Sequence, residues 1–240
     1  MALFVKVNGS VFNNSGLLRV GELKTAPIEL ADQAALMHYI FGVGLSTDNL
    51  AGTGGNTTDV GAIILQTGAK VSQTGYFDTP FSTPANGMTI MVAVTATSNS
   101  SQVTLVSSDN LANGISLFID PSAKTISGNV RGIAGSTATL SYSSIGTLPV
   151  SIISFRSNNS TRDVQIINKS LKAISNVPNP LVQSTAKARI GSSRNQFTLP
   201  GYAVLPEVAV FDAYLTDEKL AEKYLQMKIR LAQRGIVVAE

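Results

Sequence analysis

The chain has 240 residues, of which 44% are hydrophobic, enough apolar material for one large core. Only 14% are charged, against roughly 25% in an average soluble domain, so Ser, Thr, Asn, Gln and Gly must cover most of the surface. The sequence has no cysteine, which excludes a disulfide scaffold, a thiolate metal site and a cysteine nucleophile. The net charge of +3 comes from dispersed Lys and Arg with no basic run, so nucleic acid is not an expected partner.

Residues 1–24 alternate apolar and polar side chains around a turn cluster at 13–16. Two interpretations are open for this segment, an edge hairpin of the main fold or an arm that docks on a neighbouring subunit. Its apolar run is broken by Lys6 and Asn8, too early for the core of a signal peptide. No apolar stretch is long enough to span a bilayer, so we expect synthesis in a host cytoplasm and no membrane insertion.

Residues 25–240 are predicted to form one domain made mainly of short strands. The Gly-rich segment 45–61 is expected to be a long surface loop. Short strands at regular intervals, separated by turn residues, indicate an antiparallel sandwich or barrel rather than a parallel α/β sheet. The predicted strands cover residues 36–41, 88–97, 103–107, 114–119, 125–131, 149–156, 163–167 and 188–191.

One helix is predicted, over residues 216–234. Thr216 is placed to cap it, and Asp217 and Glu218 put negative charge in the first turn, where it suits the helix dipole. Gly235 supplies the stop. A single apolar stripe follows the helical repeat through Leu220, Tyr224, Met227 and Leu231.

In the C-terminal part a strand leads through a Gly-rich turn to a second strand and a short helix, in the segments 188–193 (ARIGSS), 201–202 (GY) and 207–220 (EVAVFDAYLTDEKL). This pattern resembles concanavalin A-like, laminin G-like domains. The segments 36–41 (LMHYIF), 75–80 (GYFDTP), 88–97 (MTIMVAVTAT) and 164–169 (VQIINK) match other parts of the family in order.

This resemblance covers the chain from about residue 36 to the end. It implies an all-β fold, a two-sheet antiparallel β-sandwich of the concanavalin A-like jelly-roll kind with a short C-terminal helix. The chain departs from the family in two places, since it has no Trp in the core strand and reads Asn168-Lys169 where the family hairpin has Asn-Gly. These departures leave the subfamily and the ligand open.

Some members of this superfamily are glycoside hydrolases, which need two carboxylates flanking the sugar bond. Here Glu207 is followed by Ala209 and Phe211 on the same strand face, while Asp212 points to the other side. His38, the only histidine, has no nucleophile motif near it. We therefore expect no catalytic residues and no enzymatic activity, with Glu207 bonding a nearby turn.

Relatives with this fold often bind calcium or sugars. The calcium candidates are Asp109, with Asn110 and Asn113 near it, and Asp120, but no dense acidic loop surrounds them, so we expect neither a metal site nor a cofactor. A sugar site needs an exposed aromatic ring beside amide and acid groups. The candidate glycan contacts are Tyr76, Tyr142 and Tyr202.

A lectin-like sandwich with sparse charge, no cysteine and no signal peptide looks like a structural or binding protein of a bacteriophage particle. We expect a tail, fibre or capsid-decoration component located in the virion. Its partners would be other virion proteins and copies of itself, and its candidate ligand a host polysaccharide. The alternative is a free carbohydrate-binding module or lectin, and a glycoside hydrolase ranks behind both.

Overall fold

The computed structural model describes residues 2–4, 12–13, 32, 34–45, 48–51, 55–84, 87–98, 101–110, 112–131, 137–176, 184–194 and 201–239. The chain divides into two compact units, Met1–Ala31 and Asp32–Glu240. In the first unit, β1 (Ala2–Phe4) pairs antiparallel with β2 (Phe12–Asn13) as a two-stranded sheet. The predicted boundary at residue 24 lies outside the described residues.

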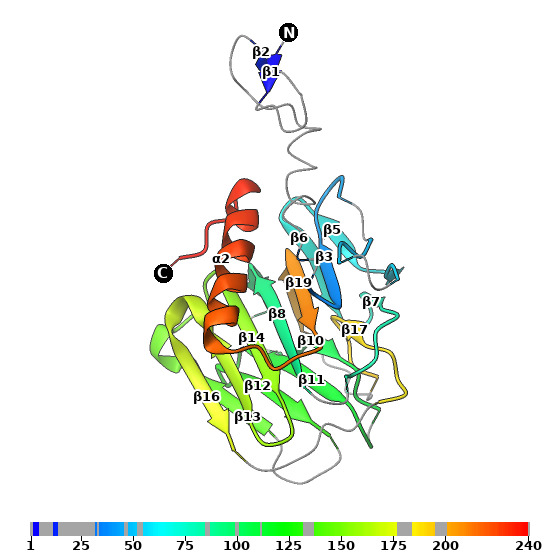
Figure 1. Cartoon of the computed structure of the whole chain (residues 1–240), viewed down its shortest axis with the longest axis vertical. Coiled ribbons are helices and arrows are strands. Elements are labelled where there is room, and N and C mark those ends of the chain that lie inside the picture. Colours follow the sequence, from blue (N-terminus) through cyan, green and yellow to red (C-terminus); the bar gives the residue numbers. More distant parts are fainter. Residues whose placement is uncertain are drawn as a thin grey trace. The chain divides into compact units, whose positions relative to one another are not determined.

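The second unit contains three antiparallel sheets, which confirms the all-β sandwich predicted from the sequence (Figure 1). The seven-stranded sheet has the order β13-β12-β11-β10-β17-β7-β4, with bounds Thr137–Ser141, Thr125–Val130, Ile115–Asp120, Val103–Ser107, Arg189–Ile190, Tyr76–Asp78 and Thr58–Val60. The six-stranded sheet has the order β16-β15-β14-β8-β19-β3, with bounds Leu171–Ser175, Arg162–Ile166, Ser151–Ser157, Met88–Val94, Glu207–Phe211 and Met37–Ile40. The four-stranded sheet has the order β5-β6-β18-β9, with bounds Ile63–Leu65, Gly68–Ser72, Tyr202–Leu205 and Ala96–Thr97.

Each predicted strand has a counterpart in the structure, but the predicted strand 88–97 is two strands. It breaks at Thr95, so β8 lies in the six-stranded sheet and β9 in the four-stranded sheet. The segment 45–61, expected to be a loop, ends in β4. Strands β5, β6, β7, β13, β16 and β18 were not predicted as strands. In the described residues, short 3-10 helices at Ser143–Ile145 and Ile167–Lys169 connect β13 to β14 and β15 to β16.

The main core lies between the inner faces of the seven-stranded and six-stranded sheets. Leu117 on β11 and Ile153 on β14 are fully buried in it. At its centre Gly128 on β12 faces the ring of Phe155 on β14, and a Cβ on Gly128 would lie only 2.2 Å from Cδ2 of that ring. The two sheets therefore pack at a distance that only glycine permits at this position.

Helix α2 (Asp217–Gln233) covers the outer face of the six-stranded sheet (Figure 1). The Thr216 hydroxyl accepts a hydrogen bond from the backbone N–H of Lys219 at 3.3 Å, as the predicted cap requires. A second buried cluster joins the helix to the sheet through Met91, Ala93, Ile152, Ala209, Phe211, Leu220, Met227 and Leu231. The helix and its apolar stripe confirm the prediction over residues 216–234.

Helix α2 thus occupies one large outer face of the sandwich, and in the described residues no α-helix covers the outer face of the seven-stranded sheet. No helix in the described ranges is both long and apolar enough to cross a membrane.

Candidate functional site

The outer face of the seven-stranded sheet carries a continuous polar row. Strand pairing places one residue from every strand in register across the whole sheet, and all of them are polar, in the order Thr137, Asn129, Ser116, Ser107, Arg189, Asp78 and Thr58. The neighbouring rung points inward and is almost entirely apolar, with Ala138, Gly128, Leu117, Val106, Ile190 and Phe77 in the same strand order. This alternation, which follows the two-residue repeat of a strand, makes one face core and gives the other a row of hydroxyl, amide and charged groups, of which Ser107 and Ser116 are buried.

An aromatic ring interrupts this polar surface. In the next outward rung Phe118 on β11 lies between Thr104 on β10 and Ser127 on β12. Ser127 Oγ in turn lies 2.9 Å from Oγ1 of Thr139 on β13. Phe118 is half-buried, whereas its strand neighbours Leu117 and Ile119 are fully buried in the core.

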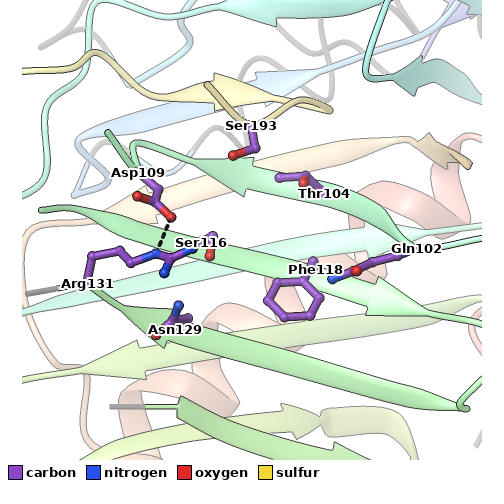
Figure 2. Close-up of a pocket in the computed structure, with 8 residues that line it drawn as sticks. All are labelled: Gln102, Thr104, Asp109, Ser116, Phe118, Asn129, Arg131 and Ser193. Atoms are coloured by element: carbon purple, nitrogen blue, oxygen red, sulfur yellow. Dashed lines mark hydrogen bonds and ion pairs between the residues drawn. The ribbon is translucent and has the colours of Figure 1, made fainter. Parts of the chain in front are cut away.

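Phe118 lines a pocket of about 240 Å³ on this face (Figure 2). Apart from the ring, the lining is polar, and it consists of Gln102, Thr104, Asp109, Ser116, Asn129, Arg131 and Ser193. Figure 2 shows Arg131 and Asp109 toward one end of the pocket and Phe118 with Gln102 toward the other. The pocket thus combines one apolar ring with amide, hydroxyl and charged groups, the mixture that fixes a polar ligand in orientation.

Asp109 and Arg131 form the ion pair of the pocket. Nε of Arg131 donates to Oδ2 of Asp109 at 2.6 Å, and the Asp109 side chain is 3% exposed while that of Arg131 is 36% exposed. The carboxylate is thus held beneath the surface, and the guanidinium rests on it and faces outward.

The turn after β10 places Asp109. Its backbone N–H donates to Ser107 Oγ at 3.1 Å, and the N–H of Asn110 donates to the carbonyl of Asn113 at 3.0 Å. Gly114 closes the turn with φ of +103°, where a Cβ would lie 2.4 Å from the Ser108 carbonyl oxygen. A bulge between Thr104 and Val106 shifts the register of β10 just before this turn, a device that re-aims side chains at sheet rims.

The structure does not bring the three candidate tyrosines together. Tyr76 on β7 lies on the outer face of the seven-stranded sheet, with the guanidinium of Arg189 at 4.4 Å from its ring centre. Tyr202 lies on the four-stranded sheet, with Nζ of Lys70 at 4.2 Å from its ring centre. Tyr142 is 1% exposed and belongs to the main core, so its ring is not available to a ligand.

The calcium candidates have local partners. Asn110 Oδ1 accepts the backbone N–H of Asn113 at 2.8 Å. Asp120 Oδ1 accepts from the hydroxyl of Ser122 at 2.6 Å and from the N–H of Ala123 at 2.9 Å. These hydrogen bonds, led by that of Ser122, lower the pKa of Asp120. In the part of the chain that the structure describes, no three His, Cys, Asp or Glu side chains gather as a metal site would need.

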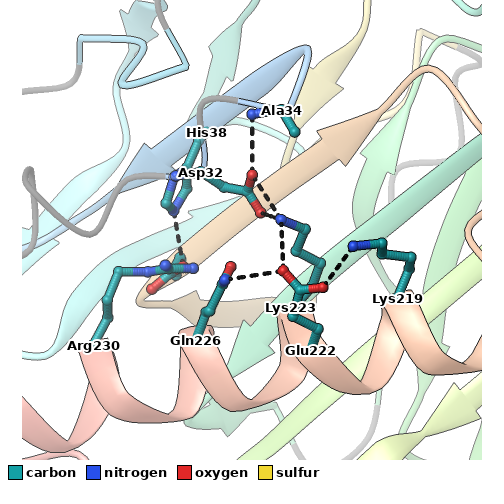
Figure 3. Close-up of polar contacts among 9 residues, drawn as sticks. Asp32, Ala34, His38, Lys219, Glu222, Lys223, Gln226 and Arg230 are labelled. Carbon is teal, nitrogen blue, oxygen red and sulfur yellow. Dashed lines mark hydrogen bonds and ion pairs between the residues drawn. The ribbon is translucent and has the colours of Figure 1, made fainter.

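His38 lies in a buried cluster beneath helix α2 (Figure 3), and its side chain contacts that of the buried Glu207. The N–H of Asp32 donates to Nδ1 of His38 at 3.0 Å, so Nε2 carries the proton and donates to Oε1 of Glu207 at 2.8 Å. Arg230 of α2 donates to the same oxygen from Nη2 at 2.6 Å. The expectation that Glu207 bonds a nearby turn was therefore wrong, because its partners come from β3 and from the helix.

Glu207 remains ionised in this cluster. Burial raises the pKa of its carboxyl group, but the hydrogen bond from His38 together with the hydrogen bonds and positive charge of Arg230 outweighs burial and lowers the pKa below its usual value. The side chains of His38 and Glu207 are both 0% exposed, so a substrate cannot reach them. As expected from strand periodicity, Ala209 and Phe211 follow Glu207 on the face that packs against α2.

Sequence reasoning missed Phe118 although the sequence contains its signal. In the segment 115–120 the apolar residues Ile115, Leu117 and Ile119 alternate with outward positions, and Phe118 is an aromatic at one of these outward positions. The pairing of Asp109 with Arg131 had no comparable signal, because 22 residues separate them.

No protein-family model and no curated protein match the sequence. Solved structures do match the fold. The receptor binding domain of botulinum neurotoxin D aligns with a TM-score of 0.61 and 12% identity, over 82% of this chain and 54% of that chain. The ligand binding domain of serotype D in complex with N-acetylneuraminic acid aligns with a TM-score of 0.59 and 13% identity, over 83% and 52%.

A sialidase from Trypanosoma rangeli, in complex with 2,3-difluorosialic acid, aligns with a TM-score of 0.58 and 10% identity, over 84% of this chain and 34% of that chain. The chain thus spans about half the length of the toxin domains and about a third of the sialidase. At these identities the similarity concerns the fold, and it agrees with the jelly-roll sandwich expected from the sequence.

Proposed function

We propose that this chain is a non-enzymatic, lectin-like module that binds glycan on the outer face of its seven-stranded sheet. The observation that carries the proposal is Phe118, a half-buried ring in a pocket otherwise lined by polar groups. An aromatic ring stacks on the apolar face of a sugar, while amides and hydroxyls such as Asn129 and Ser116 bond the sugar hydroxyls.

Two features support binding rather than catalysis. Glycoside hydrolysis commonly uses two carboxyl groups placed about 5–9.5 Å apart around the scissile bond. Asp109 is the one carboxylate among the lining residues of the pocket, and Arg131 engages it. Glu207, the acid that begins the strand matching the hydrolase pattern, is sealed beneath α2.

The structural neighbours add weight to a sugar ligand. One of the botulinum toxin domains was solved with N-acetylneuraminic acid and the sialidase with 2,3-difluorosialic acid. Because identity is low, the neighbours support the class of ligand and not the position of the site.

We further propose that the module is a structural component of a bacteriophage particle, where it acts in many copies. The support is compositional, since the chain has 14% charged residues and no cysteine. The separate pairing of β1 with β2 in its own compact unit suits a docking arm. On a particle, many copies would convert weak single-site binding into tight attachment to a host polysaccharide.

Binding of the purified full chain to an array of bacterial and animal glycans tests the first proposal. Phe118→Ala is the test variant, and Ile174→Ala is the matched control, because Ile174 is a 54% exposed apolar side chain on the other large sheet. We expect wild type and Ile174→Ala to bind a common set of glycans and Phe118→Ala to lose them. Binding that survives Phe118→Ala would move the site elsewhere, and no binding by wild type would refute a lectin role.

Mass spectrometry of purified phage particles from the source tests the second proposal. We expect the chain at many copies per particle. Its absence from particles would leave a free carbohydrate-binding module as the function.

A further inference from the structure

We infer that the pocket takes an acidic glycan, and that Arg131 recognises its carboxylate. This inference rests on the proposed glycan-binding function and deepens it. In the Asp109–Arg131 pair, Nε of Arg131 bonds to the protein, while the guanidinium also lines the pocket.

Asp109 uses only one edge of the guanidinium. Its Oδ2 accepts from Nε, and neither terminal nitrogen of Arg131 bonds to a residue that the structure describes. The end of the fork formed by the two terminal nitrogens is therefore available, in a side chain that is 36% exposed and lines the pocket. This end presents two parallel N–H groups, the geometry that binds both oxygens of a carboxylate at once.

The buried partner fixes the guanidinium without consuming this end. Asp109 is 3% exposed and is itself held by the turn after β10, so the plane of Arg131 is set before a ligand arrives. A neutral hydroxyl would use only one of the two available N–H groups, whereas a carboxylate satisfies both. The net charge of +3 on the chain also favours the approach of an anionic ligand over a cationic one.

The position of Arg131 relative to Phe118 sets the minimum size of the ligand. The N–H of Arg131 donates to the carbonyl of Gly114, which places it beside the start of β11, four residues before Phe118. At the rise of a β-strand the main-chain positions of these two rungs are about 13 Å apart, and the Arg131 side chain extends from its rung toward Ser116 (Figure 2). A ligand that contacts both Arg131 and Phe118 must therefore extend along the pocket past Ser116.

Isothermal titration of the full chain tests the inference with matched pairs of probes. Sialyllactose is compared with its methyl ester, and an oligogalacturonate with its methyl ester, so that each pair differs in the charge of the carboxylate. The variants are Arg131→Gln, Arg131→Lys and Phe118→Ala. Lys219→Gln removes the same charge from an exposed position on α2 and serves as the control.

We expect at least one carboxylated probe to bind wild type and Lys219→Gln more tightly than its neutral partner does. Arg131→Gln should weaken that binding about tenfold to a hundredfold, as expected for a charge-assisted double hydrogen bond. Arg131→Lys keeps the positive charge beside Asp109, so the protein should still fold. Lysine lacks the two parallel N–H groups of the guanidinium, so this variant should also bind the carboxylate more weakly than wild type.

Equal affinity of wild type for the acid and neutral members of both pairs would overturn the inference. So would an Arg131→Lys variant that binds the acidic probe as wild type does. If neutral glycans still bind and Phe118→Ala abolishes that binding, the proposed function stands without the acidic specificity. If no glycan binds wild type at all, both proposals fail.

Discussion

Glu207 on β19 and Arg230 on α2 form an ion pair of 2.6 Å whose side chains are 0% and 2% exposed. The pair links the six-stranded sheet to the helix that covers it, and His38 donates to the same carboxylate oxygen. A buried pair of this kind is costly to break on one side, because the remaining charge stays in the interior without a partner.

Glu207→Gln should therefore destabilise the chain strongly. We expect a loss of about 3–5 kcal/mol in the free energy of unfolding, because Arg230 is left charged and buried. Urea unfolding followed by circular dichroism measures it. A double variant with Glu207→Met and Arg230→Met is the control, and its loss should be smaller than the sum of the two single losses. Additive losses would show that the pair does not act as a unit.

The same pair predicts how stability depends on acid. The pKa of Glu207 is lowered in the folded chain, so its contribution to stability is complete above the ordinary glutamate pKa of about 4.3 and is lost as pH falls through the folded value. The melting temperature of wild type should thus fall below about pH 4.3 more steeply than that of Glu207→Gln. Parallel curves for the two proteins would contradict this assignment.

The fold could be predicted from the sequence because the strands that form the core are long and apolar. Residues 88–94 and 151–157 are buried throughout, and both were predicted as strands. Strand β13 (TATLS) was not, because Thr and Ser alternating with one alanine and one leucine give a weak signal that only pairing with β12 resolves. Propensity is a poor guide for such a strand, since its stability comes from its neighbours.

The candidate site could be predicted only in part. Alternation along 115–120 is enough to place Phe118 outward, and a search for aromatic residues at outward positions would have found it. The pairing of Asp109 with Arg131 depends on a bulge in β10 and on the turn at Gly114, which fix directions that periodicity does not encode. Tyr142 failed as a candidate for a different reason, because it follows the outward Ser141 in the same two-residue alternation and so points into the core, and strand β13 was not predicted.

Four of the six tyrosines should resist ionisation in the folded chain. Burial raises the pKa of Tyr39, Tyr142, Tyr214 and Tyr224, and Asp163, which accepts from the Tyr214 hydroxyl at 2.5 Å, raises that of Tyr214 further. At about pH 11, one unit above the ordinary pKa of about 10, native protein should therefore absorb less as tyrosinate than protein unfolded in guanidinium. Equal absorbance in the two states would contradict the burial of Tyr39 and Tyr142 and the partial burial of Tyr214 and Tyr224.

Gly128 should be intolerant of any side chain, because it lies directly beneath the pocket face with its Cα against the ring of Phe155. A Cβ would sit 2.2 Å from Cδ2 of that ring, so Gly128→Ala must push the two sheets apart or rotate the ring. Overpacking of this kind costs about 1–3 kcal/mol in the free energy of unfolding, measured by urea denaturation. Ser127→Ala is the matched control on the same strand, since Ser127 points away from Phe155 to the outer face of the sheet, where it is 5% exposed, and the variant loses only the 2.9 Å contact with Thr139. A change in the spacing of the two sheets would move β12 and the pocket residues that it carries. Gly128→Ala should therefore also weaken glycan binding more than Ser127→Ala does. Wild-type stability in Gly128→Ala would show that the sheets are not packed at the distance described.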